Sequence, residues 1–183
     1  MSTQGARSVP RERDESDDFG QRQCHDAAVG SSLERPAIVG INHVGISVTD
    51  VERSIRFYCD VLGASIVRKP FGGYRGFSGR MAIHALGTHI LDLFEHAANG
   101  GEQFQPNRTG LDHIGLTATS DDELNAWASW LDSCDVKCSA IREVENNMGA
   151  MFDFVDPDGI QLEFLVIDTG QLPPQAPPTV FRS

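Results

Sequence analysis

Residues 43–50 alternate between apolar side chains and small or polar ones. A period of two predicts a β-strand with one face in a core and the other facing away from it. The face predicted to enter the core carries Val44, Ile46 and Val48, and the opposite face carries His43, Gly45 and Ser47. The strand therefore turns a histidine away from the core.

The same alternation returns 70 residues later, in residues 113–120. The core face there carries Ile114, Leu116 and Ala118, so His113 occupies the position equivalent to His43. A capping box, which predicts a helix start, follows each strand: Thr49 with Glu52, and Ser120 with Glu123. Two copies of one unit predict a pseudo-symmetric domain.

Each unit continues as one helix and three further strands. In the first unit we expect a strand over 39–48, a helix over 50–62 ended by Gly63, strands over 64–69, 80–86 and 88–95, and a glycine-rich loop over 70–79. In the second unit we expect a helix over 121–134, strands over 136–143, 149–155 and 159–166, and a tight turn over 156–159.

The last strand of each unit sets one carboxylate among apolar residues. The carboxylates are Asp92, between two leucines, and Glu163, between a leucine and a phenylalanine. Because the apolar neighbours take the core face, both carboxylates turn to the other face, as His43 and His113 do. Each residue alone could be an ordinary polar side chain or the partner of an arginine. Four metal-binding side chains at equivalent positions favour a metal site.

Residue composition divides the chain into three parts. Residues 1–36 are polar and have no hydrophobic period, which predicts a disordered N-terminal arm. We expect one domain over 37–170, consisting of module one (39–95), a connector (96–109) and module two (110–168). A proline-rich tail follows over 171–183.

Charge and composition exclude several classes of protein. The formal net charge of −11 opposes binding to the phosphates of nucleic acid, and no apolar run could span a bilayer. We find no secretory or transit segment, and the four cysteines form neither a CxxC pair nor a zinc-ribbon spacing. We therefore expect a cytoplasmic protein with reduced thiols, no nucleic-acid partner and no membrane partner.

Three features are shared with a known superfamily: the doubled histidine strand, the helix end Phe57-Tyr58-x-x-Val61-Leu62-Gly63, and the segment Phe154-Val155-Asp156-Pro157-Asp158-Gly159-x-x-Leu162-Glu163. On these features, residues 39–168 resemble the vicinal-oxygen-chelate superfamily of glyoxalases, bleomycin-resistance proteins and extradiol dioxygenases, and are closest to its glyoxalase-like metal-binding branch. The resemblance implies an α+β fold in which two βαβββ modules form an incomplete barrel that encloses a metal.

The resemblance also implies that His43, Asp92, His113 and Glu163 bind one divalent metal ion, which agrees with the alternation along the strands. Two imidazoles and two carboxylates suit Zn, Ni, Co, Mn or Fe(II). The ion would stabilise an enolate as a Lewis acid, and Glu163 or Asp92 would transfer a proton as the catalytic residue. We therefore expect a metal-dependent lyase or isomerase that acts on a small oxygenated substrate.

Two other functions fit the same residues. An Fe(II) extradiol ring-cleaving dioxygenase needs only His43, His113 and Glu163, and a non-catalytic drug- or metabolite-binding resistance protein could use the same cleft. Substrate contacts are expected at Ser47, Tyr74, Arg75, His84, Arg142 and Asn146. By analogy with the superfamily we expect a homodimer, and the connector allows the halves to pair within one chain or between two.

Overall fold

The computed structural model describes residues 38, 40–145 and 148–167. Residues Val39–Pro174 form one compact unit, and Ile38 lies outside it. The predicted arm and tail therefore lie outside the described residues. All described helices and strands belong to the unit Val39–Pro174.

Module one contains β1 (His43–Ser47), α1 (Val51–Arg56), β2 (Ser65–Gly72), β3 (Gly79–Leu86) and β4 (His89–His96). The helix widens after α1 into a π-helical turn, η1 (Phe57–Val61), and Gly63 follows with a φ of 73°, as expected for a glycine that ends a helix. The strand order is β1-β4-β3-β2, with β1 parallel to β4 and the other neighbours antiparallel.

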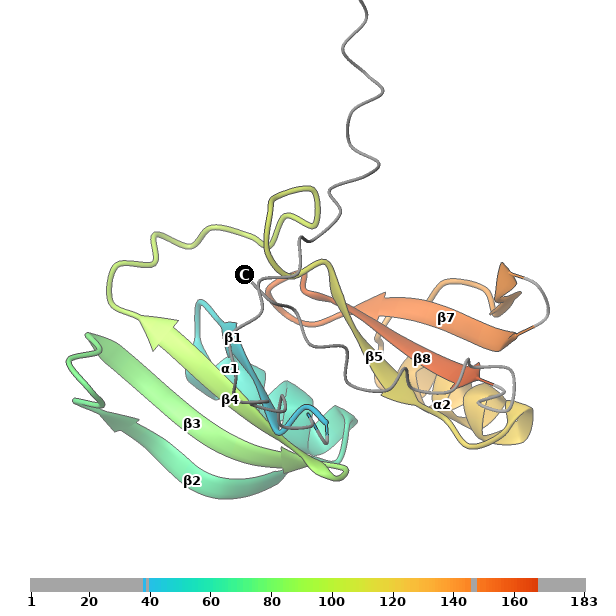
Figure 1. The fold of residues 1–183 in the computed structure, drawn as a ribbon, viewed down its shortest axis with the longest axis horizontal. Helices are drawn as coiled ribbons and strands as arrows, with labels where there is room; N and C mark the ends of the chain where they lie inside the picture. Colours follow the sequence, from blue (N-terminus) through green and yellow to red (C-terminus); the bar gives the residue numbers. More distant parts are fainter. Residues whose placement is uncertain (1–37, 39, 146–147, 168–183) are drawn as a thin grey trace, which may run out of the picture. The chain divides into compact units, whose positions relative to one another are not determined.

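Module two contains β5 (His113–Thr117), α2 (Asp121–Ser133), β6 (Arg142–Glu143), β7 (Gly149–Val155) and β8 (Gln161–Ile167). Its strand order is β5-β8-β7-β6, with β5 parallel to β8, so both modules share one topology (Figure 1). The α+β class and the two βαβββ modules are thereby confirmed. The two mixed sheets are not closed into a barrel, as the predicted incomplete barrel requires.

The strand predicted over 136–143 was wrong in length, because β6 covers only Arg142–Glu143. Ser139, ahead of β6, is bound to β7 in another way. Its N–H donates to the carbonyl of Asp153 at 2.8 Å, and its hydroxyl accepts the N–H of Asp153 at 2.9 Å. A serine side chain therefore replaces the regular strand pairing here.

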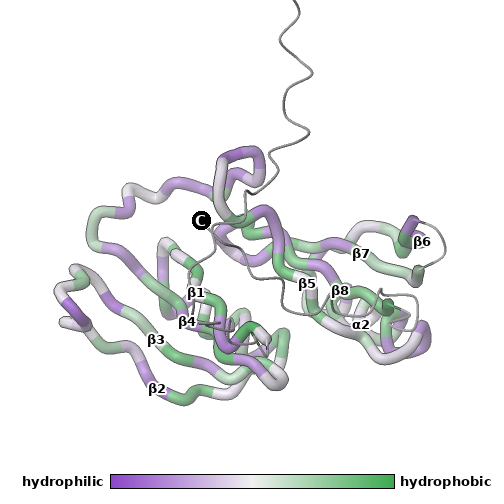
Figure 2. The backbone as a smooth tube through the Cα atoms, in the orientation of Figure 1, coloured by the Kyte–Doolittle hydropathy of each residue, from purple (hydrophilic) through white to green (hydrophobic). Residues whose placement is uncertain are grey.

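Burial confirms the alternation predicted for β1. Ile46 and Val48 are buried, whereas His43, Gly45 and Ser47 are exposed. Figure 2 shows hydrophobic and hydrophilic residues alternating along the strands of both modules. The histidine side of each sheet thus faces away from the helix, which covers the other side.

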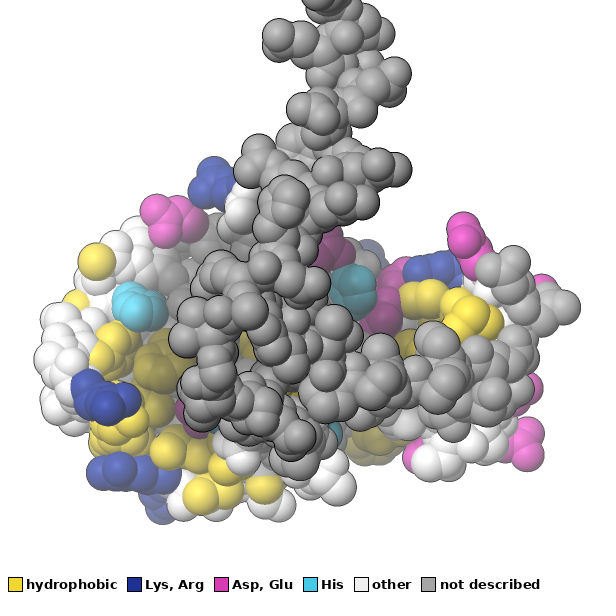
Figure 3. All heavy atoms as spheres, in the orientation of Figure 1, with side chains coloured by type: hydrophobic (Ala, Val, Ile, Leu, Met, Phe, Trp, Pro, Cys, Tyr) yellow, Lys and Arg dark blue, Asp and Glu magenta, His cyan; other side chains and the backbone are white. Residues whose placement is uncertain are grey.

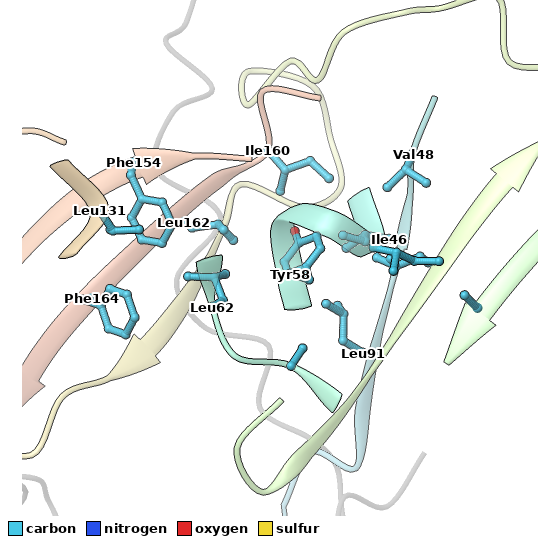
Figure 4. Close-up of a cluster of buried hydrophobic side chains, with 14 of the residues drawn as sticks. Ile46, Val48, Tyr58, Leu62, Leu91, Leu131, Phe154, Ile160, Leu162 and Phe164 are labelled. Carbon is cyan, nitrogen blue, oxygen red and sulfur yellow. The ribbon is translucent and has the colours of Figure 1, made fainter. Parts of the chain in front are cut away.

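One buried hydrophobic cluster takes side chains from both modules. Tyr58 and Leu62 come from the helical segment of module one, and Ile160 and Leu162 come from module two (Figure 4). Full burial of an aliphatic side chain contributes about 1.5–3 kcal/mol. This cluster is therefore a main source of stability for the pair of modules.

Helix α1 does not begin with the predicted Thr49–Glu52 capping box. Asp50 is its N-cap residue, and the Asp50 carboxylate accepts the N–H of Arg53 at 3.0 Å. The Thr49 hydroxyl donates instead to Asp158 in module two, which also accepts Arg53 Nη2 at 2.6 Å. A carboxylate more than 100 residues away in the sequence therefore takes the place expected for Glu52.

Helix α2 keeps its predicted start with one change. Ser120 Oγ accepts the N–H of Glu123 at 3.2 Å, which is the first half of a capping box. The Glu123 carboxylate reaches one residue further back than expected and accepts the N–H of Thr119 at 2.6 Å. This helix is capped by residues next to it in the sequence.

The edge strand β2 exposes hydrophobic as well as basic side chains. Ile66 is 47% exposed and Val67 is 60% exposed, and Arg68 and Lys69 follow them. On the face drawn in Figure 3, basic and hydrophobic side chains gather over this side of module one. The described part of the chain contains no helix of the length and hydropathy needed to cross a membrane.

Candidate metal centre

Both modules present a histidine, a glycine and a carboxylate in the same arrangement. Gly45 pairs with Asp92 across the parallel strands β1 and β4, and Gly115 pairs with Glu163 across β5 and β8. Each candidate histidine lies two residues before the glycine, and residues two apart share one face of a strand. A histidine and a carboxylate therefore lie on the same face of each sheet.

The paired glycines leave room for the neighbouring side chains. A Cβ atom at Gly115 would lie 3.3 Å from Glu163 Oε1 and 3.1 Å from the Leu165 side chain. A Cβ atom at Gly45 would lie 3.1 Å from the ring of Phe94. A larger residue at either position would push against the face that carries the candidate ligands.

The residue before each histidine binds its Nδ1 atom. Asn42 Oδ1 lies 2.9 Å from His43 Nδ1, and Asp112 Oδ1 lies 2.7 Å from His113 Nδ1. Since these oxygens only accept hydrogen bonds, Nδ1 carries the proton in the neutral ring. The lone pair is then on Nε2, so each imidazole is prepared to bind a metal through Nε2.

Asp112 also affects the protonation of His113. Its hydrogen bond raises the pKa of His113, and the charge of Glu163 raises it further. A protonated imidazole cannot bind a metal, so protons compete with a metal ion for His113. A metal ion at this histidine would therefore be bound more tightly as the pH rises through the His113 pKa.

The two candidate carboxylates are shielded from solvent. Glu163 is only 8% exposed, and its Oε1 atom lies 3.5 Å from His113 Nε2. Asp92 is partly buried, and its Oδ1 atom is buried without a hydrogen-bond partner among the described residues. An unpaired buried carboxylate oxygen is unfavourable, and a bound cation would compensate for it. These donors therefore fit a divalent metal ion.

Of the four candidate ligands, His113 and Glu163 lie close together, with 3.5 Å between Nε2 and Oε1, and His43 and Asp92 share one face of the other sheet. We call His43 and Asp92 half-site one, on the sheet of module one, and His113 and Glu163 half-site two, on the sheet of module two. Among residues 38, 40–145 and 148–167, no three His, Cys, Asp or Glu side chains lie close enough together to hold one metal ion. The chain itself brings His113 and Glu163 together.

An ion pair lies beside half-site two. Asp153 of β7 pairs directly with Glu163 of β8, so the two side chains share a face. Arg142 Nη1 lies 2.5 Å from Asp153 Oδ2, and Arg142 Nη2 lies 3.0 Å from Asp153 Oδ1. The predicted substrate contact Arg142 is therefore close to the candidate metal ligands, but its guanidinium already has a carboxylate partner.

Aromatic side chains lie beside half-site one. Phe94, two residues after Asp92 on β4, packs edge-to-face on Phe77 with ring centroids 5.4 Å apart. Phe77 belongs to the loop between β2 and β3, which also carries Tyr74 and Arg75. The Arg75 guanidinium lies 5.9 Å from the centroid of the Tyr74 ring. The loop therefore reaches the face of half-site one through Phe77.

Three other predicted substrate contacts have different outcomes. Ser47 is exposed on the histidine face of β1, as expected. His84 is completely buried and pairs with Leu91, so it faces the core, away from Asp92. We therefore do not count His84 among the substrate contacts. Asn146 lies outside the described residues.

His113 also borders a cavity of about 370 Å³ between strands of the two modules. The lining is mainly apolar and includes Val44, Leu91, Ile114 and Leu162, together with the Tyr58 ring. The volume is within the range of small-molecule pockets. A hydrophobic group of a ligand could therefore be accommodated next to the His113 strand.

Sequence reasoning missed four residues of this region. Asn42 and Asp112 could have been found, since each precedes a repeated histidine and each carries a side-chain oxygen. Asp153 could not be placed beside Glu163 without the register of β7 and β8. Phe94 shares the parity of Asp92, but its packing on Phe77 depends on the course of the loop.

Known proteins resemble this chain over the same region. The model of the Glyoxalase/Bleomycin resistance protein/Dioxygenase superfamily matches residues 40–164. The uncharacterized protein YaeR of Escherichia coli is 32% identical over 124 residues, which are 67% of this chain and 92% of YaeR. The metallothiol transferase FosB of Staphylococcus haemolyticus is 32% identical over 135 residues, which are 74% of this chain and 86% of FosB.

A solved structure agrees with the sequence matches. The glyoxylase/bleomycin resistance protein/dioxygenase domain from Frankia sp. EAN1pec superposes with a TM-score of 0.64 and 26% identity, covering 72% of this chain and 99% of that domain. The doubled module, the repeated histidine and carboxylate and these matches define the class. The chain belongs to the Glyoxalase/Bleomycin resistance protein/Dioxygenase superfamily.

Proposed function

We propose that the protein is a metal-dependent lyase or isomerase that acts on a small oxygenated substrate. The observation that carries this proposal is the repeated half-site: a histidine whose Nδ1 is held by its neighbour, on the same face as a shielded carboxylate. Members of the superfamily bind divalent metals and include metal-dependent enzymes. His43, Asp92, His113 and Glu163 would bind the ion here.

The residues of the chain divide the work between binding and proton transfer. When bound, a divalent ion would supply Lewis-acid stabilisation of negative charge on a substrate oxygen. Asp92 or Glu163 would take a proton from the carbon beside a carbonyl group and return it at another position. The burial of Glu163 and the partial burial of Asp92 limit their contact with water, and Asn42 and Asp112 would keep the imidazoles in the tautomer that ligates through Nε2.

We further propose that the complete site forms in a homodimer, with half-site one from one copy and half-site two from the other. Two features support this arrangement. The strands β1 and β5, which carry the histidines, each lie at the end of their sheet's strand order. An end strand has a free edge that can pair with a strand of another copy. Half-site one of one copy would then lie next to half-site two of the other copy.

A second candidate is a metal-dependent thiol transferase, which the 32% identity to the metallothiol transferase FosB favours. Such an enzyme would use the same metal ligands but would need a thiol as second substrate. An Fe(II) dioxygenase would need only His43, His113 and Glu163, and a binding protein would need no turnover. The identity of the bound metal separates several of these functions.

Elemental analysis tests the proposal. The protein would be purified without a histidine tag or added metal, beside His113→Ala and the matched control His89→Ala, which removes another exposed histidine. We expect near-stoichiometric Zn, Ni, Co or Mn in the wild type and in His89→Ala, and its loss in His113→Ala. A metal-loaded wild type would then be screened with 2-oxoaldehyde thiol adducts and acyl-CoA epimers.

Other results would change the conclusion. Iron in place of these metals would favour ring cleavage of catechols. Turnover that requires an added thiol as co-substrate would favour the transferase. If none of the proteins held a metal after incubation with divalent cations, the enzyme proposals would be rejected and the region would remain a binding site.

A further inference from the structure

Position 153 differs in chemistry from its counterpart in module one. Asp153 pairs with Glu163 across β7 and β8, and Ile83 occupies the same place opposite Asp92 across β3 and β4. The sheet of module two therefore places a second carboxylate next to a candidate metal ligand. The sheet of module one has an aliphatic side chain there, so metal binding itself does not require an acid at this position.

The Asp153 carboxylate is held firmly against Arg142. Both Nη atoms of Arg142 lie against the two oxygens of Asp153, which is the bidentate geometry that makes Arg–carboxylate pairs strong. Ser139 contacts both residues: its Oγ atom accepts from Arg142 Nη1 at 3.3 Å and from the backbone N–H of Asp153 at 2.9 Å, and it lies 3.5 Å from the carboxylate oxygen Oδ2 of Asp153. The Arg142 side chain is nonetheless 47% exposed, so a ligand can approach it.

The ion pair with Asp153 determines which ligand groups Arg142 can bind. A free guanidinium beside a metal site would bind the carboxylate, phosphate or phosphonate group of a substrate in the same bidentate way. Here the two Nη atoms already face Asp153, and an incoming anion would also be repelled by Asp153 and by the nearby Glu163. Rejection of a competitor by like charge is a common source of specificity.

We propose that Asp153 is a specificity-determining residue that neutralises Arg142, so that the position beside Arg142 takes uncharged oxygenated groups such as those of α-hydroxyketones and rejects phosphonate and phosphate groups. This inference rests on the proposed function, because it assumes that the substrate binds at half-site two. It names the substrate class of that site. It also predicts that the protein selects against the ligands that an unpaired arginine would favour.

The test compares two variants with the same change in charge. Asp153→Asn removes the carboxylate that faces Arg142, and the control Glu143→Gln removes a neighbouring exposed carboxylate on β6. Mn²⁺ retention is first measured by electron paramagnetic resonance. Binding of methylphosphonate and of uncharged hydroxyacetone to the Mn²⁺-loaded proteins is then measured from the relaxation of ligand protons.

We expect Asp153→Asn to bind methylphosphonate about tenfold more tightly than the wild type, with hydroxyacetone affinity changed less than twofold. Glu143→Gln should change methylphosphonate affinity by less than twofold, and adding Arg142→Gln to Asp153→Asn should abolish the gain. Equal methylphosphonate affinity in the two single variants would overturn the inference. So would a parallel change for both ligands, because that result would indicate a general structural role.

The two proposals fail in different ways. Failure of the wild type to bind Mn²⁺, together with the absence of metal in elemental analysis, would reject the metal centre. In that case, the role of Asp153 in neutralising Arg142 is tested by calorimetric titration of the metal-free proteins with methylphosphonate. Tighter binding to Asp153→Asn than to Glu143→Gln would still support the role of Asp153, and equal binding would reject it.

Discussion

Modules one and two share a fold and the candidate metal ligands, but they differ in the residues around those ligands. In each module a histidine on the first strand and a carboxylate on the last strand share a face, with a glycine opposite the carboxylate. In each, the preceding residue fixes the histidine tautomer through Nδ1. Under the proposed function, both half-sites would present the same donors to one ion.

The surroundings of the half-sites are not alike. Asp92 has Ile83 opposite it and Phe94 nearby on its strand, which makes a largely apolar wall. Glu163 has Asp153 opposite it, with Arg142 bound to that acid. The histidine, the glycine and the carboxylate are therefore alike in the two modules, whereas the residues around the carboxylate, which a substrate would contact, differ. Residues that differ between the modules are the better guide to substrate choice.

The largest expected effect comes from mixing variants of the two half-sites. His43→Ala and His113→Ala should each lose the metal, since each removes one imidazole. If a site combines halves of two copies, a mixed dimer contains one site that lacks both histidines and one intact site. Unfolding and refolding the two variants together should therefore restore metal to a fraction of the dimers, measured by elemental analysis.

The same experiment has a clear contrary result. When each site lies within one chain, every chain in the mixture carries a damaged site and no metal returns. Wild-type protein taken through the same refolding serves as the control for recovery. The result decides whether the two modules of one chain serve the same metal centre.

A second prediction concerns the turn between β7 and β8, where module two carries Asp156 and module one has only Gly87 and Thr88 at the corresponding turn. Asp156 is 4% exposed, and burial raises its pKa to about 6. In the unfolded chain its pKa is about 3.9. A raised pKa favours the protonated form in the fold, so this contribution is present below about pH 4 and is lost as the pH rises through 6.

Between pH 4 and pH 7 the metal-free wild type should therefore lose about 2–3 kcal/mol of stability relative to Asp156→Asn, which cannot titrate. Urea unfolding at several pH values measures the difference. Asp60→Asn, which changes an exposed carboxylate of module one and keeps Asp156, should lose stability with rising pH as the wild type does. Equal pH dependence in the two variants would contradict the prediction.

The smallest expected effect compares the residues that hold the histidines. Asp112→Ala should weaken metal binding about 10- to 100-fold, the usual effect of removing such a hydrogen bond. Asn42→Ala should weaken it less, because a neutral amide oxygen polarises the imidazole less than a carboxylate does. Competition with a coloured chelator measures both affinities. A greater loss in Asn42→Ala would show that the charge of Asp112 is unimportant.

Much of the fold follows from local features of the sequence. The period of two in β1 and β5 places His43 and His113 on the face away from the core, and the burial of Ile46 and Val48 confirms it for β1. Gly63 ends the first helix, and Gly159 has a φ of 81° in the predicted tight turn. These features were predictable because backbone conformation and side-chain direction depend on neighbouring residues.

Features that depend on distant residues were not predictable. Thr49 satisfies the capping pattern, but its hydroxyl binds Asp158, and no local rule indicates that partner. In the sequence, Asp153 is only a polar residue in an apolar strand, and the register of β7 and β8 is needed to place it opposite Glu163. In each case an interaction between separate segments decides the role.

The bond between Thr49 and Asp158 has a consequence for the order in which the protein folds during synthesis. The ribosome releases the start of α1 long before it releases the turn that carries Asp158. Until then the Thr49 hydroxyl and the Arg53 guanidinium lack the carboxylate that binds them in the finished fold. A nascent chain that ends before this turn should consequently show rapid amide hydrogen exchange at the beginning of α1, and release of the last module should slow it.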